Sequence, residues 1–180
     1  MNLRRALSPG TAFGLAVWAL AVRRLAFAHL AVVHEGSPSP AAPRTIDDVT
    51  LAQAFYARLD RGARDHYAFR VADDIAGRFI LLVPATAYDG GFRADVLLTG
   101  PGLPDEGRPL SPAGDSPMTI AGIDYRLAAA LSPDLGPGDY RVEVRSTSDA
   151  DGVYSLCVGD REAGAADPVT RERVRALIGV

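Results

Sequence analysis

Hydrophobic and polar residues alternate with a period of two along much of the chain after residue 46. In residues 139–145, Tyr140, Val142 and Val144 share one face and charged residues share the other. Such alternation is typical of a strand with one face on a core and one in water. Further strands are predicted at residues 49–55, 65–71, 78–84, 94–99, 118–127 and 153–158. Because glycine- and proline-rich turns separate these short strands, the pattern predicts a β-sandwich.

Two segments depart from this pattern. Residues 100–117 contain five prolines and four glycines, which predicts a long surface loop. Gly122, inside the strand expected next, is interpreted as a β-bulge. Near the C-terminus, Asp167 is a good N-cap and Pro168 suits the first helical position, so a short helix is predicted at about 168–178 on the edge of the sandwich.

The N-terminus has the three parts of a secretory signal peptide. Arg4 and Arg5 precede an apolar stretch at residues 11–22, and Ala26-Phe27-Ala28 provides a small-x-small cleavage site. Residues 1–28 are therefore predicted to be a signal peptide. Arg23-Arg24 lies between the apolar stretch and the cleavage site, and positive charge there opposes translocation. The alternatives are an uncleaved segment that anchors the protein at the membrane, and translation that starts at another residue.

The predicted domain organisation follows from these segments. Residues 36–44 contain three prolines, two serines and one glycine, so residues 29–45 are predicted to be an extended, poorly ordered linker. The sandwich is expected at residues 46–163, and residues 164–180 contain the helix. The secreted or periplasmic space is the expected location, and the membrane is reached only if the N-terminal segment stays uncleaved.

The charge distribution agrees with export. All 19 basic residues are arginine, and 22 residues are acidic. The first 28 residues hold four of the arginines and no acidic residue, so the body of the chain is acidic. An acidic balance without a basic patch argues against a nucleic-acid partner. The single cysteine excludes an intramolecular disulfide and a cysteine-based zinc site.

Several motifs carry a family resemblance. The motifs lie at Asp65-x-Tyr67-x-Phe69, Asp95-x-Leu97 with Gly100-Pro101-Gly102, Gly138-x-Tyr140-x-Val142-x-Val144, and Gly152-x-Tyr154-x-Leu156-x-Val158. Together they resemble the bacterial pre-peptidase C-terminal domain, a non-catalytic module of secreted enzymes. The resemblance implies an all-β fold, a jelly-roll-like antiparallel β-sandwich, here with a short C-terminal helix. It covers about residues 46–163, and a group of uncharacterised exported bacterial proteins is similar.

The candidate metal ligands are His29, His34, Asp47 and Asp48. If cleavage follows Ala28, the terminal amine and imidazole of His29 would form a chelate that favours Cu²⁺, and His34 could add a second imidazole. Some domains of the resembled family bind Ca²⁺ through acidic residues before the first strand, where this chain has Asp47-Asp48. The plainer interpretation is a solvated His29 and turn-forming aspartates, which also fits Asp73-Asp74 and Asp149/Asp151. No cofactor is required.

Other candidate residues favour structural roles. Cys157 lies beside core positions and is interpreted as an inert, partly buried thiol. His66 alternates outward and is expected on the surface. Tyr140 and Tyr154 are interpreted as core aromatics, and a sugar-stacking platform is the alternative. The sequence contains no Gly-x-Ser-x-Gly and no His-Glu-x-x-His motif, so an enzyme is not expected.

The leading hypothesis is therefore an exported, non-catalytic β-sandwich that binds a protein or a polysaccharide at the cell envelope. Two alternatives remain open at this stage. One is a periplasmic copper-binding protein that uses His29, and the other is a cryptic hydrolase.

Overall fold

The structure is a computed structural model that describes residues 29–180 except residues 38, 163 and 165. The predicted signal peptide, residues 1–28, lies outside the described residues, and so does its cleavage site. Neither helix of the described chain is long and apolar enough to cross a membrane.

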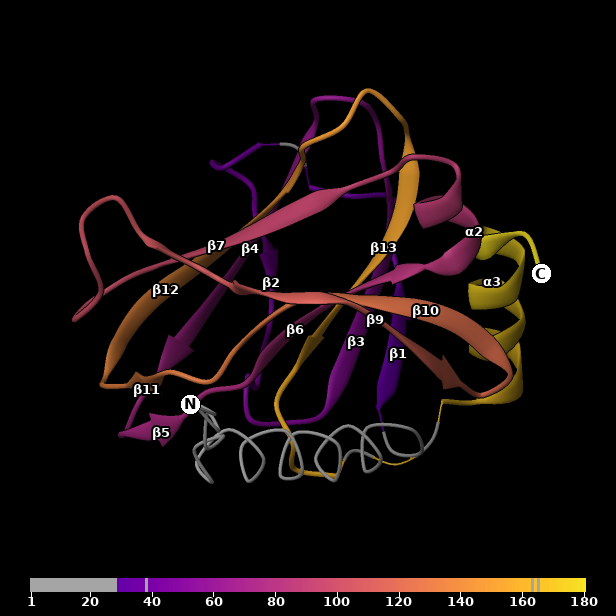
Figure 1. Ribbon diagram of the computed structural model, residues 1–180. Helices are drawn as coiled ribbons and strands as arrows, with labels where there is room; N and C mark the ends of the chain where they lie inside the picture. Colours follow the sequence, from indigo (N-terminus) through magenta and orange to yellow (C-terminus); the bar gives the residue numbers. More distant parts are fainter. Residues whose placement is uncertain (1–28, 38, 163, 165) are drawn as a thin grey trace, which may run out of the picture.

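Two sheets form a β-sandwich (Figure 1). The larger sheet has the strand order β1 (Leu30–Val33), β3 (Gln53–Leu59), β13 (Gly152–Val158), β6 (Phe79–Pro84), β10 (Ile123–Leu131) and β9 (Ser111–Ile120). The smaller sheet has the order β2 (Arg44–Thr45), β4 (Arg64–Val71), β12 (Gly138–Ser146), β7 (Ala94–Thr99) and β8 (Arg108–Pro109). A separate short pair joins β5 (Ile75–Ala76) to β11 (Asp134–Leu135). The predicted all-β sandwich is confirmed, and the pairs are antiparallel except β1–β3 and β2–β4.

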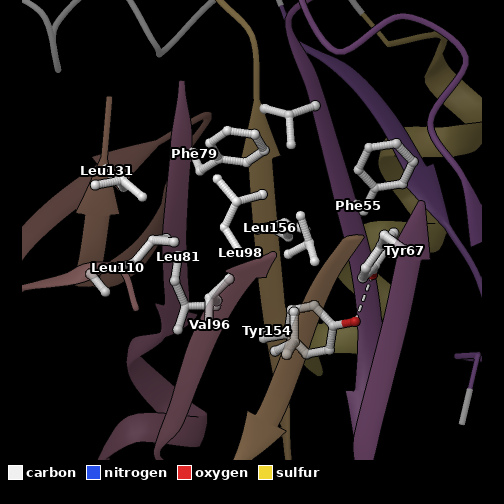
Figure 2. Close-up of a cluster of buried hydrophobic side chains, with 14 of the residues drawn as sticks. Phe55, Tyr67, Phe79, Leu81, Val96, Leu98, Leu110, Leu131, Tyr154 and Leu156 are labelled. Atoms are coloured by element: carbon white, nitrogen blue, oxygen red, sulfur yellow. Dashed lines mark hydrogen bonds between the residues drawn. The ribbon is translucent and has the colours of Figure 1, made fainter. Parts of the chain in front are cut away.

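The main core lies between the two sheets. The smaller sheet contributes Tyr67, Phe69 and Val142, and Figure 2 shows Tyr67 facing side chains of the larger sheet such as Phe55 and Leu156. Side chains alternate between the faces of a strand, which brings every second residue into this layer. The alternation predicted for Tyr154, Leu156 and Val158 is confirmed, since all three belong to this core while Val153 and Cys157 belong to a cluster on the other face.

The larger sheet is covered on both faces. Its outer face carries Ile80 and Cys157, which share a second buried cluster with Val174 and Ile178 of α3 (Pro168–Ile178). Burial on both sides explains why β6 is a continuous apolar run. The predicted helix and its cap are confirmed, because the Asp167 carboxylate accepts the Thr170 N–H at 2.9 Å. The short helix α2 (Ala85–Asp89) was not predicted.

The loop predicted at residues 100–117 is wrong in its second half, where β8 and the start of β9 lie. Strand β9 tolerates proline because it is the edge of the larger sheet. Residues Ala121 and Gly122 both have positive φ and form a two-residue hairpin turn between Ile120 and Ile123, not a bulge. Moving away from this turn, hydrogen-bonded pairs of residues alternate with non-hydrogen-bonded pairs. Pro117 and Arg126 form a non-hydrogen-bonded pair. The missing N–H of Pro117 therefore removes no hydrogen bond between β9 and β10.

The linker predicted at residues 29–45 also differs from the structure, which forms β1 and β2 within it. Strand β1 extends the larger sheet by pairing in parallel with β3. Its apolar residues explain this placement, because Val32 packs against the main core while Ala31 and Val33 pack against the outer cluster. Residues 29–37 are therefore part of the sandwich.

Candidate functional site: a buried polar network between the sheets

Asp65 lies on the inward face of β4, in line with Tyr67 and Phe69. Only 1% of its surface is exposed. Burial of a carboxylate is costly unless hydrogen bonds compensate it, so the partners of Asp65 decide whether it is tolerated.

Two donors from distant parts of the chain reach the Asp65 carboxylate. The Tyr154 hydroxyl, on β13 of the opposite sheet, donates to Oδ2. The backbone N–H of Ser37, in the segment after β1, donates to Oδ1. The carboxylate therefore connects the two sheets with the N-terminal segment.

The network continues from Tyr154 to His34. The hydroxyl oxygens of Tyr154 and Tyr67 are 2.6 Å apart, a bond drawn in Figure 2. The Tyr67 hydroxyl is 2.8 Å from His34 Nε2, and the Gly36 N–H donates to His34 Nδ1 at 3.0 Å.

This geometry assigns every proton in the network. Tyr154 donates its one hydroxyl proton to Asp65, so Tyr67 must donate to Tyr154. His34 Nδ1 accepts from Gly36, so the neutral ring carries its proton on Nε2 and donates it to Tyr67. All the bonds run in one direction, from Gly36 to the carboxylate.

The electrostatics agree with neutral ring groups. Burial raises the pKa of Tyr67 and of Tyr154 well above its usual range, so both stay protonated. Burial also lowers the pKa of His34, and Arg44 adds to that effect, while the charge of Asp65 opposes it. His34 is therefore neutral at pH 7.

Aromatic packing encloses the His34 end of the network. The His34 ring meets Tyr67 edge-on at 5.6 Å and Phe55 at 6.5 Å between centroids. The Arg44 guanidinium lies 5.8 Å from the centre of the Phe55 ring. Gly36 adopts φ +95°, which a residue with a side chain rarely takes, and this turn aims the Ser37 N–H at Asp65.

The structure does not bring the predicted metal ligands together. His29 and His34 flank β1, about 16 Å apart along an extended chain. The Asp48 carboxylate accepts from Thr50 and pairs with Arg161, contacts that lower its pKa, chiefly through Thr50. Asp47 is exposed. Across residues 29–180, as far as they are described, no three His, Cys, Asp or Glu side chains form a group that could hold a metal.

The remaining candidates have structural surroundings. Tyr140 is 1% exposed and its hydroxyl lies 3.0 Å from the carbonyl oxygens of Pro101 and Gly136, so neither it nor buried Tyr154 forms a sugar-stacking platform. Cys157 is buried, which raises its pKa to about 11 and fits an inert thiol. Asp151 accepts the Arg61 N–H at 2.7 Å, as expected of a turn aspartate.

The outer face of the smaller sheet presents charged side chains to solvent. We call it the charged face, and it consists of Arg64, His66, Arg70, Asp95, Asp139, Arg141, Glu143 and Arg145. Opposite charges meet across the strands, as in Arg64–Glu143 at 3.0 Å and Arg145–Asp95 at 3.4 Å. His66 points outward as predicted, although its side chain is only 13% exposed beside Glu143.

Reasoning from the sequence did not find the buried network. One signal was available, because Asp65 shares the apolar face of a predicted strand with Tyr67 and Phe69. A carboxylate on a core-facing position requires buried partners. No local pattern could name those partners, since His34 and Tyr154 lie 31 and 89 positions away.

Comparisons with known proteins identify structural neighbours only. No family model and no curated protein matches the chain. The pre-peptidase C-terminal domain of collagenase from Bacillus anthracis is similar over 66% of this chain and 95% of its own, with 18% identity and a TM-score of 0.43. PliG of Salmonella Typhimurium, a periplasmic inhibitor of g-type lysozyme, covers 66% of this chain and 98% of its own, with 17% identity and a TM-score of 0.38.

A mutant of PliG from Escherichia coli is similar over the same shares, with 17% identity and a TM-score of 0.37. The family that the sequence motifs resemble is thus also found among the structural neighbours. At TM-scores below 0.5, these matches carry no argument about what this chain binds.

Proposed function

We propose that the chain is an exported, non-catalytic β-sandwich module that binds a protein partner through its charged face. The non-catalytic part of this proposal rests on the surroundings of four side chains that could act as acids or bases. Asp65, Tyr67 and Tyr154 are buried and His34 is half-buried, and they are joined in one continuous chain of hydrogen bonds. Groups used in this way stabilise the fold and are not available to a substrate.

The surface supports binding of a protein in preference to a polysaccharide. Sugar binding relies on exposed aromatic rings, and the outward residues of β4, β12 and β7 include no Phe, Tyr or Trp. The charged face instead offers both signs of charge in a fixed pattern, which suits electrostatic complementarity with a protein surface. Arg70 and Asp139 form the most exposed of its ion pairs, each with 79% of the side chain accessible.

The experiment is affinity capture from the envelope fraction of the producing bacterium. The double variant Arg70→Glu/Arg145→Glu reverses two surface charges of the charged face, and it should fold because surface ion pairs contribute little to stability. The matched control, Arg171→Glu, reverses an exposed charge on α3.

We expect a protein that the wild type and the control retain and that the double variant loses. Equal retention by all three would reject the charged face as the binding surface, and retention of polysaccharide alone would reject the protein partner. Fractionation and N-terminal sequencing of the exported chain test the predicted cleavage after Ala28, and recovery of the chain only in the cytoplasm would overturn export.

A further inference from the structure

The segment of residues 29–37 is held in the sandwich at two places. Along β1, its backbone pairs with β3, and the Leu30 N–H donates to the Ala52 oxygen at 2.9 Å while the His34 N–H donates to the Tyr56 oxygen at 3.1 Å. Beyond β1, Ser37 donates to Asp65 and accepts from the His66 N–H at 2.9 Å. Strand β1 has only four residues, and the contacts beyond it add to the backbone pairing and side-chain packing that retain the segment.

The turn between these two places depends on an unprotonated nitrogen. His34 Nδ1 accepts the Gly36 N–H and so fixes the turn that presents the Ser37 N–H to Asp65. A proton on Nδ1 would replace this acceptor with a donor, and two N–H groups would then face each other at the same spacing. The bond from Nε2 to Tyr67 persists on protonation, since that nitrogen already carries its hydrogen.

The surroundings of His34 compensate an added charge only in part. From β2 the Arg44 guanidinium disfavours the imidazolium, and from β4 the Asp65 carboxylate favours it. Phe55 on β3, Tyr67 on β4 and Tyr154 on β13 are uncharged, and Glu35 of the same segment is exposed. Burial is the largest effect on the pKa of the ring and lowers it, so the proton binds more tightly once the segment has left.

We propose that this network is a pH-sensitive latch, in which protonation of His34 releases residues 29–37 from the sandwich and opens the edge of β3. An equilibrium shifts toward the state that binds the proton better, here the released segment with a solvated imidazole. Release withdraws Val32 from the main core and Val33 from the outer cluster. It leaves the backbone of β3 unpaired on the side that β1 had occupied.

The test is hydrogen exchange of the full chain at pH 7.5 and pH 5.5, corrected for the intrinsic pH dependence of exchange. A solvated imidazole with a pKa near 6.5 favours the released state by up to about tenfold between pH 7.5 and pH 5.5, the limit for a ring that stays neutral in the folded protein. We therefore expect protection of residues 30–37 and of β3 to fall several-fold, by up to about tenfold, in the wild type. Protection of β12, at the centre of the other sheet, should stay unchanged.

Variants identify the responsible group. His34→Asn can retain an acceptor for the Gly36 N–H without a titratable proton, so its protection of residues 30–37 should not change between the two pH values. The controls His29→Gln and His66→Gln each remove another imidazole and should keep the wild-type response. Unchanged protection in the wild type, or an equal loss in His34→Asn, would overturn the proposal.

A second measurement does not depend on the folding of a variant. In an NMR titration of the wild type, the amide resonances of Gly36 and Ser37 should change with the same midpoint as the His34 ring. Titration of the ring without any change at these two amides would equally overturn the latch.

Discussion

The Tyr154 hydroxyl has two partners at the centre of the sandwich, because it donates to Asp65 and accepts from Tyr67. A buried polar group left without its partner costs about 1–3 kcal/mol. Tyr154 therefore contributes a hydrogen bond as well as a packed aromatic ring, and the buried Asp65 carboxylate depends on its hydroxyl as a donor.

Replacing Tyr154→Phe should destabilise the protein by about 2 kcal/mol or more, since it removes a donor from Asp65 and an acceptor from Tyr67. The free energy of unfolding from urea denaturation measures the effect. The control is Tyr88→Phe, which loses an exposed bond to Asp115 and should change stability by less than about 0.5 kcal/mol. Equal stability of the two variants would show that the network does not support the fold.

Gly100 lies so close to the Tyr140 ring that there is no room for a side chain at this position. It adopts φ +151°, and a Cβ there would lie 2.2 Å from the Tyr140 ring. We expect Gly100→Ala to cost about 2 kcal/mol or more, because strain in the backbone adds to overpacking. Gly102 also has positive φ, but a Cβ there would meet no atom within 4 Å. The matched variant Gly102→Ala should therefore lower the free energy of unfolding by only about 1 kcal/mol. Thermal unfolding compares them, and a milder effect at Gly100 would contradict the contact.

At the scale of elements, edge position explains where the sequence-based prediction was wrong. Residues 111–120 contain two prolines and still form β9, because an edge strand needs hydrogen bonds on one side only. The linker prediction was wrong for β1 for a related reason, since four apolar residues become a strand only when β3 offers them an edge. In contrast, α3 was predicted to its boundaries, because its cap and its proline are signals within the helix itself.

Helix α3 also protects Cys157, which shares a buried cluster with Val174 and Ile178. Asp167→Ala removes the cap of this helix and should weaken it by about 1 kcal/mol. Local opening would then expose the thiol more often, so we expect alkylation of Cys157 in the native protein to become about fivefold faster. Asp105→Ala, in an exposed loop, should label at the wild-type rate. An unchanged rate in Asp167→Ala would mean that α3 does not control access to Cys157.

At the scale of the whole molecule, stability should depend on pH through His34. Its pKa is lower in the folded protein, so below about pH 6.5 the unfolded chain binds more protons than the folded chain. The contribution of neutral His34 to the free energy of unfolding is therefore present above that pH, and it is lost as the pH falls. Asp48 and Asp167 also have lowered pKa values, but their contributions are lost only below about pH 4.

Urea denaturation between pH 7.5 and 5.5 should therefore show a fall in the free energy of unfolding of up to about 1 kcal/mol, since water screens part of the effect at a half-buried ring. His34→Asn should remove most of this dependence, and His66→Gln should retain it. A wild-type profile that is flat in this range would contradict the placement of a neutral His34 in the folded protein.

What the sequence by itself determined was the local part of the fold. Alternation within each segment predicted the inward faces of β4, β12 and β13, and it identified the sandwich, because a strand with one apolar face must cover that face with another sheet. Charge and composition argued against a nucleic-acid partner without any knowledge of which strands pair.

Only the tertiary structure decided which distant residues meet. His34, Asp65 and Tyr154 belong to separate segments, and no rule of spacing connects them. The network exists because β1 adds to the edge of β3, while β4 and β13 face each other across the core. Which strand pairs with the edge of β3, and which strands face each other across the core, are determined only when the whole chain packs. The candidate site and its proposed response to pH therefore follow from the fold and not from a sequence motif.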